Sequence, residues 1–392
     1  MSTVCKNGKC SGCKACIDIC PRGAISFSDN LTYLEANIDK EKCIECNLCH
    51  KVCQENNPPD LHNPIAWYQG WAKDQHIREG ASSGGIASAL STAFINNGGV
   101  VCSCKFMNGD FHYQISNSIR ALEGCAGSKY VKSNPEGAYK SIRKYLIQGT
   151  KVLFIGLPCH VAAARNYVGQ TLENELYTVD LICHGTPSLL LLKKFLKQYG
   201  YELDNTSDLK FRNKAHFAIG DSYKSVVVKG GTDRYSLAFL NSLIYTENCY
   251  ECKYARLERV SDITLGDSWN SELPKDEQQQ GISLVLCQTE KGKKLLEISN
   301  LCLHNVDLDK AVSANHQLRE PSTKPAAYKD IFEKLKKGNK FNSVIFRYLP
   351  LKCIKQNIKQ LLLKTKCMRG GVIIYSISIQ EQKYCSKQNY AE

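Results

Sequence analysis

The chain has 392 residues, of which 43% are hydrophobic and 23% charged, a composition typical of folded globular proteins. This length predicts two or three domains, and the composition excludes a disordered or membrane-embedded chain. The longest apolar run near the end, Gly371 to Ile379, is about half the roughly 20 residues that a membrane-spanning helix needs. Residues 1–20 contain five cysteines in place of an apolar signal-peptide core, so we expect a cytoplasmic protein without a transmembrane segment.

Net charge and cysteine content indicate which classes of protein fit this sequence. The net charge is +13, and residues 311–392 alone carry sixteen Lys or Arg against five Asp or Glu, a balance of +11. A basic tail invites a nucleic-acid interpretation, but no RNA-binding motif, zinc finger or helix-turn-helix pattern accompanies it, so we expect no nucleic-acid partner. Twenty-one cysteines in a long chain without a secretion signal indicate metal ligands rather than a disulfide framework.

Residues 1–57 form a cysteine-rich unit that a linker-like stretch, Asn56–Pro59, closes. The spacing C-x2-C-x2-C-x3-C occurs there twice, at Cys10, Cys13, Cys16 and Cys20 and again at Cys43, Cys46, Cys49 and Cys53. In two-cluster 4Fe-4S ferredoxins the fourth cysteine of each run binds the neighbouring cluster. We therefore predict one cluster on Cys10, Cys13, Cys16 and Cys53 and a second on Cys43, Cys46, Cys49 and Cys20. The alternative, a pair of zinc sites, usually separates C-x2-C pairs by a dozen or more residues.

Three details of this unit lie outside the ligand pattern. The second run ends with Cys53-Gln54, without the proline that follows Cys20, which loosens the turn but removes no ligand. Cys5 belongs to neither run, and we interpret it as a buried or spare thiol. Between the runs, Ala24–Phe27 and Thr32–Ile38 are expected to pair as a small hairpin.

Beyond the linker, short β-branched runs alternate with helical stretches, as in α/β proteins. The expected elements are a helix over Gly85–Asn96 with a strand from Val100, a strand over Lys151–Ile155 with a helix over Val161–Tyr167, a strand over Leu176–Ile182 with a helix over Ser188–Tyr199, and later strands at Ser225–Lys229 and Ser283–Gln288. Two consecutive strand-turn-helix units predict parallel strands. From about residue 311 the sequence becomes helical and lysine-rich, with a break at Pro350.

A third group of cysteines follows predicted strands. Cys159 and Cys183 each come just after a strand, and the carboxyl ends of adjacent parallel strands meet at one edge of a sheet. With the pair Cys249 and Cys252 they make four sulfurs, enough for one more 4Fe-4S cluster. The spacing leaves an alternative open, in which Cys159 and Cys183 are packed core thiols and only the C-x2-C pair binds metal.

Small residues in Glu79–Gly85 precede a helix, where backbone N–H groups can approach an anion. The same Ser/Gly turn is equally compatible with a helix cap that binds nothing. Cationic and aromatic side chains in Gly127–Tyr130 and Lys210–Lys214 are of the kind that a flavin diphosphate or an acidic substrate needs, although surface charge explains them as well.

Taken together, these motifs resemble the coenzyme F-420 hydrogenase/dehydrogenase beta-subunit family, which also takes in plant-type 7-hydroxymethyl chlorophyll a reductases. After the dicluster unit, the motifs that carry the resemblance occur in the family's order at Arg78–Gly85, Gly127–Ser133, Gly156–His160, Asp180–Ser188, Phe211–Lys214, Cys249–Ala255 and Asp262–Trp269. The resemblance covers about residues 1–310.

The resemblance implies a flavoprotein with FAD and a third 4Fe-4S cluster at Cys159, Cys183, Cys249 and Cys252. The flavin contacts that it implies are Ser82, Ser83, Gly84, Gly85, Lys129 and Tyr130. The expected fold is a ferredoxin-like dicluster domain at 1–57, a mixed α/β flavin-binding catalytic domain at 65–310 in two parts (65–150 and 151–310), and a basic helical tail at 311–392.

We therefore expect a ferredoxin-coupled, flavin-dependent reductase or dehydrogenase that moves electrons between 4Fe-4S clusters and a small two-electron substrate. Two alternatives remain: an electron-transfer subunit of a larger redox complex without its own substrate site, and a binding protein in which the clusters are structural. The expected partner is ferredoxin or another redox protein. In the tail, Leu351, Ile354, Ile358, Leu361 and Leu362 share a helix face that suits docking on the protein's own body, which we favour, or on a membrane or partner.

Overall fold

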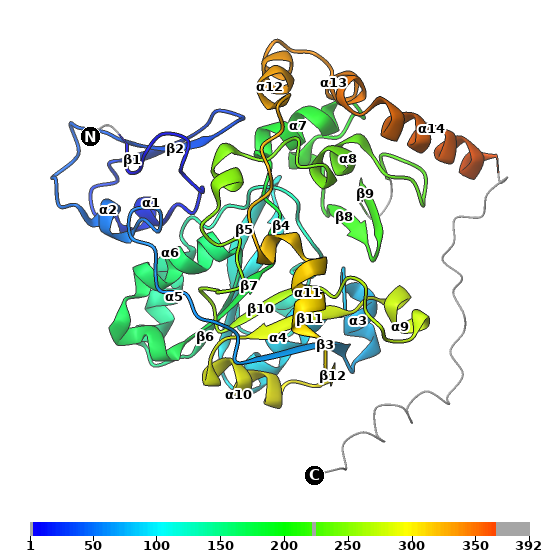
Figure 1. Ribbon diagram of the computed structural model, residues 1–392. Helices are drawn as coiled ribbons and strands as arrows, with labels where there is room; N and C mark the ends of the chain where they lie inside the picture. Colours follow the sequence, from blue (N-terminus) through cyan, green and yellow to red (C-terminus); the bar gives the residue numbers. More distant parts are fainter. Residues whose placement is uncertain (1–2, 222–224, 366–392) are drawn as a thin grey trace.

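The computed structural model describes residues 3–221 and 225–365, and the sequence prediction for Gly371–Ile379 lies outside them. Figure 1 shows a small N-terminal unit beside a central sheet, with helices above the sheet and α14 at the outer edge. In the described residues, no helix has the length and apolarity to cross a membrane.

The N-terminal unit repeats one backbone pattern. It contains α1 (Ala15–Ile19), β1 (Ile25–Asp29), β2 (Leu34–Ile38) and α2 (Leu48–Val52). The predicted hairpin is confirmed, because β1 and β2 pair antiparallel with Ile25 opposite Ile38. Gly12 and Glu45 take φ values of 78° and 54°, and Lys14 and Asn47 take 57° and 60°. These left-handed residues sit at equivalent places in the two cysteine runs, so each run turns its thiols inward in the same way.

The central sheet has eight strands in the order β12-β3-β11-β10-β7-β6-β4-β5. Their bounds are β3 (Ala66–Ala72), β4 (Val100–Met107), β5 (Asp110–Ser116), β6 (Val152–Ile155), β7 (Leu176–Leu181), β10 (Ile263–Asp267), β11 (Ser283–Cys287) and β12 (Leu301–His304). The four central strands β10, β7, β6 and β4 are parallel, and the strands on either side of them pair antiparallel. The predicted parallel arrangement of β6 and β7 is therefore confirmed.

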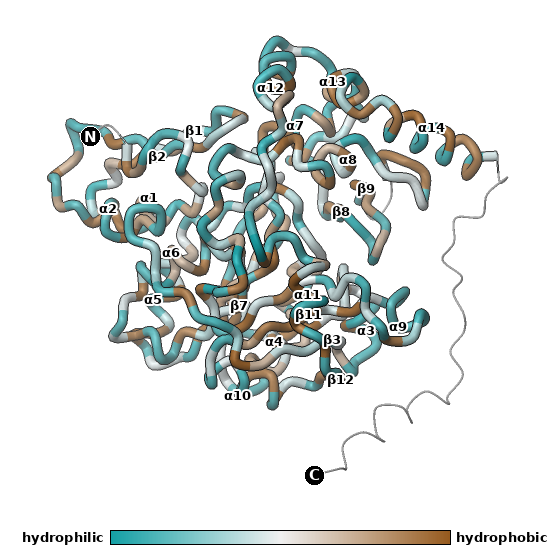
Figure 2. The backbone as a smooth tube through the Cα atoms, in the orientation of Figure 1, coloured by the Kyte–Doolittle hydropathy of each residue, from teal (hydrophilic) through white to brown (hydrophobic). Residues whose placement is uncertain are grey.

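Helices cover both faces of this sheet. They are α3 (Gln75–Gly80), α4 (Ile86–Asn96), α5 (Ala138–Ile147), α6 (Pro158–Val168), α9 (Lys275–Gln280), α10 (Glu290–Ile298) and α11 (Leu308–Ala314). Val152 and Phe154 of β6 pack into the core with α5 and α6, while Leu153 packs into the core with α4 and α10. Because both faces are buried, the strand reads as a continuous apolar run, and Figure 2 shows hydrophobic stretches along the central strands.

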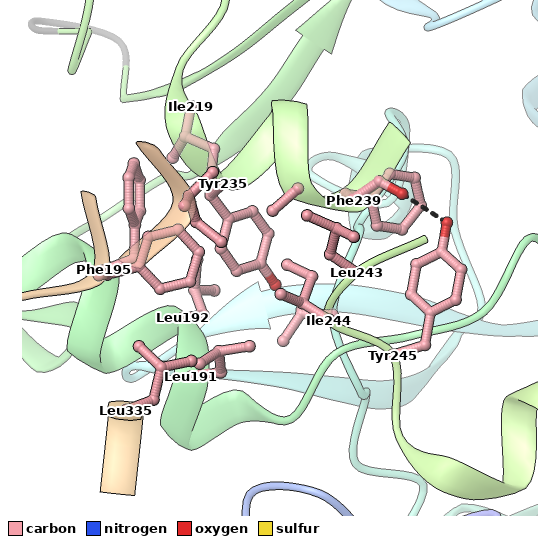
Figure 3. Close-up of a cluster of buried hydrophobic side chains, with 14 of the residues drawn as sticks. Leu191, Leu192, Phe195, Ile219, Tyr235, Phe239, Leu243, Ile244, Tyr245 and Leu335 are labelled. Atoms are coloured by element: carbon pink, nitrogen blue, oxygen red, sulfur yellow. Dashed lines mark hydrogen bonds between the residues drawn. The ribbon is translucent and has the colours of Figure 1, made fainter. Parts of the chain in front are cut away.

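A second core lies above the sheet. It is built by α7 (Leu189–Lys197), the hairpin of β8 (Lys210–Asn213) and β9 (His216–Gly220), α8 (Arg234–Leu240), α12 (Tyr328–Lys336) and α13 (Phe341–Tyr348). Figure 3 shows Phe195 of α7, Tyr235 of α8 and Leu335 of α12 converging there. Residues 328–345 therefore belong to the body of the protein. The described 3-10 helices are Arg120–Leu122, Gln170–Glu175, Leu203–Asn205, Glu247–Glu251 and His316–Leu318.

One predicted strand is wrong. Within Ser225–Lys229, Ser225 forms only an isolated bridge to Gly220. The β-branched run ends in a turn, because the Gly231 N–H donates to the Val228 carbonyl at 2.9 Å. The strand pair of this region, β8 and β9, lies earlier in the chain.

The last described helix, α14 (Pro350–Lys364), begins at the predicted proline break. It docks on the body through Cys353, which is buried in the second core, and through polar groups. Gln356 accepts from the Thr232 N–H at 3.2 Å, and Asn357 accepts from Arg234 at 2.9 Å. Its apolar side chains face outward, with exposed fractions of 80% for Leu351 and 62% for Leu361. The favoured interpretation, docking on the body through the apolar face, is therefore wrong, because polar partners on the body occupy the opposite face.

Candidate functional site

Four thiols from the two N-terminal runs enclose one cavity. Cys10, Cys13, Cys16 and Cys53 line a space of about 20 Å³. Cys53 comes from the second run, so the structure brings together the crossed set that the spacing predicts for one cluster. Phe27 of β1 and Ala36 of β2 also line the cavity.

Cys5 lines the same cavity, although the sequence places it outside both runs. Hydrogen bonding from the Cys5 thiol lowers the pKa of both Cys10 and Cys53. Cys5 is therefore a neighbour of the predicted ligand set, and its assignment as a buried or spare thiol stays a prediction. No spacing rule marks it, because it reaches the cavity through the bridge between Thr3 and Asn37 that aligns the N-terminal segment with β2.

The other N-terminal set lies nearer the surface. Cys20 and Cys43 lie close enough to Cys49 to raise its pKa, after the larger effect of burial. Backbone N–H groups reach two of the sulfurs, from Ala24 to Cys20 at 3.2 Å and from Glu45 to Cys43 at 3.4 Å. The fourth predicted ligand, Cys46, is exposed. Beside it, Ile44 and Leu48 have exposed fractions of 58% and 39%, which leaves an apolar rim around this set.

A second cavity, of about 40 Å³, is lined by Cys159, Cys183, Cys249 and Cys252. Cys159 lies in the first turn of α6 after β6, and Cys183 follows the end of β7. Since β6 and β7 are adjacent and parallel, their carboxyl ends carry both thiols to one edge of the sheet, as predicted. Cys249 lies in the 3-10 helix over Glu247–Glu251 and Cys252 follows it, so one loop closes the cavity from the other side.

A buried ion pair fixes that loop against the sheet. Arg259 and Asp180 are 1% and 0% exposed, and Arg259 Nη2 lies 3.1 Å from Asp180 Oδ1. The same guanidinium donates to the carbonyl of Tyr254 at 2.5 Å and to that of Leu181 at 2.9 Å. Tyr254 lies two residues after Cys252, and Leu181 lies two residues before Cys183. The Arg259–Asp180 ion pair therefore fixes the position of Cys252 relative to Cys183.

The polar environment of this cavity suits sulfur ligands with negative charge. Cys249 Sγ accepts from the Thr186 N–H at 3.4 Å and lies 3.8 Å from Lys132 Nζ. Burial alone would lower the pKa of Lys132, but its electrostatic interaction with Cys249, Cys159 and Cys183 outweighs burial and raises the pKa. The two cavities also share a wall, since Ser11, Gln54 and Glu55 line both.

A single metal ion and a 4Fe-4S cluster require different spacing of their thiol ligands. Across residues 3–221 and 225–365, no three His, Cys, Asp or Glu side chains lie close enough to hold one metal ion. Zinc requires its thiolates within about 2.3 Å of one point, whereas the thiolates of a cubane are held apart by the iron and sulfide between them. A 4Fe-4S cluster therefore needs its four thiols farther apart than a single zinc ion does.

The Ser/Gly turn packs against the sheet. The Gly84 N–H donates to Ser283 Oγ at 3.0 Å, and a Cβ on Gly84 would lie 2.4 Å from the carbonyl oxygen of Gly70. Gly85 caps α4 with a φ of 82°, so both glycines are required by the backbone. Ser83 donates to the Ile282 carbonyl at 2.9 Å. The turn is therefore part of the fold, whether or not an anion also binds there.

Arg212 joins two of the predicted flavin contacts. Its guanidinium donates to the Ser82 carbonyl at 2.7 Å, to the Tyr130 hydroxyl at 3.1 Å and to both oxygens of Asp267. The Tyr130 ring stacks on Phe239 with centroids 4.4 Å apart. The sequence marks Arg212 only as part of a cationic stretch and does not single out Asp267, although both lie in motifs that carry the resemblance.

Lys129 is not brought into this group, because its ammonium donates to the carbonyls of its own loop at Cys125, Ala126 and Gly127. Lys214 contacts the turn, because its ammonium donates to the Ser83 carbonyl at 3.0 Å. Burial, followed by the charges of Arg78 and Arg212, lowers the pKa of Lys214 to about 8. Two cationic side chains thus border the turn: Lys214, and Arg212 with its partner Asp267.

His184 connects this basic region with the second cavity. It lines the cavity beside Cys183, and its ring lies 6.4 Å from that of Phe239, on which Tyr130 stacks. His160 has a different role, because it is fully buried in α6 and its Nδ1 lies 3.1 Å from the Tyr113 hydroxyl. Burial lowers the pKa of His160 to about 3, so it is a neutral core residue.

Comparison with known proteins gives three family matches. A 4Fe-4S dicluster domain matches residues 9–57. The N-terminal and C-terminal domains of the coenzyme F420 hydrogenase/dehydrogenase beta subunit match residues 67–136 and 149–310.

Individual relatives are distant. The chain is 24% identical over 327 residues to a subunit of the F(420)H(2) dehydrogenase of Methanosarcina mazei, covering 76% of this chain and 84% of that protein. It is 21% identical over 368 residues to the coenzyme F420-dependent sulfite reductase of Methanocaldococcus jannaschii, covering 88% of this chain and 53% of that protein. One polypeptide of the F420-reducing [NiFe] hydrogenase complex from Methanosarcina barkeri aligns with a TM-score of 0.47 at 16% identity, covering 71% of this chain and 94% of that polypeptide.

The two beta-subunit domains match in the expected order and follow the dicluster domain directly along the chain. The protein therefore belongs to the coenzyme F420 hydrogenase/dehydrogenase beta-subunit family and carries a 4Fe-4S dicluster domain at its N-terminus.

Proposed function

We propose that this protein is an iron-sulfur flavoprotein oxidoreductase that transfers electrons between 4Fe-4S clusters and a two-electron substrate at FAD. Family membership and the dicluster domain support a redox role. The observation that carries the proposal is the second cavity, in which four cysteines from three separate segments face one space that shares a wall with an N-terminal cysteine set. Packed core thiols have no physical reason to converge in this way.

The three cysteine sets form a series through the protein. The set that contains Cys46 lies at the surface with Ile44 and Leu48 exposed beside it, which suits contact with ferredoxin or another redox protein. The set of Cys10, Cys13, Cys16 and Cys53 lies inside it. The proposed third cluster, on Cys159, Cys183, Cys249 and Cys252, lies beyond. Because electron tunnelling rates fall steeply with distance, the shared wall between the inner two sets favours exchange between them.

The basic region next to the third set fits a flavin. Lys214 supplies positive charge for a diphosphate beside the Ser/Gly turn. Arg212, whose charge is paired with Asp267, holds Ser82 and Tyr130 in place. Ser82 and Ser83 contribute mainly by holding these cations through their carbonyls, and Gly84 and Gly85 by shaping the turn. A bound flavin supplies the exchange between a hydride and single electrons. The names of two relatives refer to coenzyme F420, so that deazaflavin is the first substrate to test.

The decisive experiment is anaerobic reconstitution of the full chain with iron, sulfide and FAD. The expected product holds one flavin and about twelve iron atoms per chain, at four per cluster. Cys183→Ser should lower the iron content by about a third and slow flavin reduction through the N-terminal clusters. The control Cys125→Ser changes a half-buried thiol that lines neither cavity and should retain all of the iron. If no flavin binds and Cys183→Ser leaves the iron unchanged, the proposal fails.

The second candidate is an electron-transfer subunit of a larger redox complex. The outward apolar face of α14 favours it, since a row of exposed leucine and isoleucine side chains suits a partner. A protein with a full set of clusters but no flavin and no reaction with free substrates would support this candidate instead.

A further inference from the structure

A single buried lysine lies between the two inner cysteine sets. Lys132 is 6% exposed, and its ammonium donates to the carbonyl of Ser11 at 2.9 Å. Ser11 follows Cys10, a thiol of the first cavity. On the other side, Lys132 Nζ lies 3.8 Å from Cys249 Sγ in the second cavity. Lys132 thus contacts residues that line both cavities.

Among the described residues, no carboxylate forms an ion pair with Lys132. Three lysines line the second cavity there, and the other two have acidic partners: Lys9 pairs with Glu251, and Lys253 pairs with Glu55 at 3.0 Å. Lys132 contacts the Ser11 carbonyl and the Cys249 sulfur instead. A buried ammonium is costly unless an opposite charge compensates it. The groups placed to do so are the two sets of thiolates.

A chain of buried hydrogen bonds holds this region in place. Tyr254 donates to Gln54 Oε1 at 2.6 Å, and Gln54 Nε2 donates to Ser11 Oγ at 3.1 Å. Gln54 is 3% exposed and stands where the first cysteine run has proline. The side chain therefore ties the shared wall to the loop that carries Cys252. This chain fixes the Ser11 carbonyl to which Lys132 donates.

We propose that Lys132 raises the reduction potentials of both clusters that flank it, relative to the surface cluster. The inference rests on the proposed third cluster for one of its two sides. A reduced cluster carries one more negative charge than an oxidised one, so a fixed positive charge nearby stabilises the reduced state. The effect is large where water is excluded, and Lys132 is buried. An electron that arrives at the surface set is then drawn inward to the pair around Lys132.

The test is a redox titration of the reconstituted full chain, in which each cluster is followed by electron paramagnetic resonance. The variants are Lys132→Gln, which retains a hydrogen-bond donor and removes the charge, and Lys132→Arg, which retains both. In Lys132→Gln the equilibrium between reduced and oxidised forms should shift at least tenfold toward oxidised at both flanking clusters, a change of about 59 mV for one electron. Lys132→Arg should titrate like the wild type, and the surface cluster should be unchanged in every variant.

The outcomes separate this inference from the proposed function. A wild-type protein with about eight iron atoms per chain contradicts the third cluster, and the inference is then judged on the inner N-terminal cluster alone. If Lys132→Gln loses the third cluster, the reduction potential of the inner N-terminal cluster still tests the inference. Unchanged potentials at the flanking clusters in Lys132→Gln overturn the inference, because a purely structural lysine alters occupancy and not potential.

Discussion

Replacing Arg259 by methionine tests the ion pair that holds the cysteine loop to the sheet. The substitution keeps much of the side-chain volume but leaves Asp180, which is 0% exposed, without its cation. Removing one partner of a buried pair costs about 3–5 kcal/mol, because the remaining charge stays buried and uncompensated. For a domain of this size that cost corresponds to a fall in unfolding midpoint of roughly 6–20 °C.

The assay is thermal unfolding of the reconstituted protein, together with its iron content. Arg259 also donates to the carbonyls of Tyr254 and Leu181, so the loop with Cys249 and Cys252 should separate from Cys183 and the third cluster should be lost. The double variant Asp180→Asn with Arg259→Met should recover much of the midpoint, since no buried charge remains. Lys310→Met serves as the control, because its partner Glu272 is 76% exposed and the pair should contribute nothing measurable.

The pH dependence gives a second check on the cause. Burial raises the pKa of Asp180, and Arg259 opposes that shift. Without Arg259 the pKa of Asp180 in the folded protein rises further above its unfolded value. A carboxyl of this kind destabilises the fold once the pH exceeds the unfolded pKa, so the defect of Arg259→Met should shrink as the solution is acidified. A midpoint within about 2 °C of wild type at neutral pH would refute the reasoning, since it would mean a cost below about 1 kcal/mol.

Further tests address the N-terminal clusters, the last helix and the basic turn. Cys46→Ser should remove about half of the N-terminal iron and leave the inner set loaded, as measured by iron analysis. A chain that ends at Leu349 should keep its clusters, whereas one that ends at Ser343 also loses the buried Val344 and Ile345, worth roughly 1.5–3 kcal/mol each, and should aggregate. FAD affinity measured against pH should fall above about pH 8 as Lys214 loses its proton, and Lys214→Arg should remove that fall.

The ferredoxin unit and the parallel strands could be predicted because their signals are local. The cysteine spacing encodes the turns, and the left-handed residues at Gly12 and Glu45 follow from it. Cys159 and Cys183 could be placed together because adjacent parallel strands end at one edge. The strand predicted at Ser225–Lys229 is wrong, because β-branched residues also precede turns. Here the bond from the Gly231 N–H to the Val228 carbonyl closes a turn.

Other features depend on contacts between residues far apart in the sequence, and no local spacing pattern predicts them. Lys132 reaches Ser11 across 121 positions, and Gln54 meets Tyr254 across 200. The periodicity of α14 identifies its apolar face correctly, but it does not say which face meets the body. The polar contacts of Gln356 and Asn357 decide that orientation, and their partners lie more than 120 positions away.

Gln54 has a consequence for how freely the first 57 residues can be exchanged. Its amide is bonded on both sides, to Ser11 within the unit and to Tyr254 in the body. Asp18 accepts from the Gly137 N–H at 2.8 Å, and Asp29 accepts from Ser188 at 2.7 Å. A free ferredoxin with proline in place of Gln54 would leave the Tyr254 hydroxyl buried without a partner. The unit keeps the cysteine spacing of a free ferredoxin, but part of its surface is buried against the rest of the protein. A free ferredoxin could therefore not replace residues 1–57 without losing these contacts.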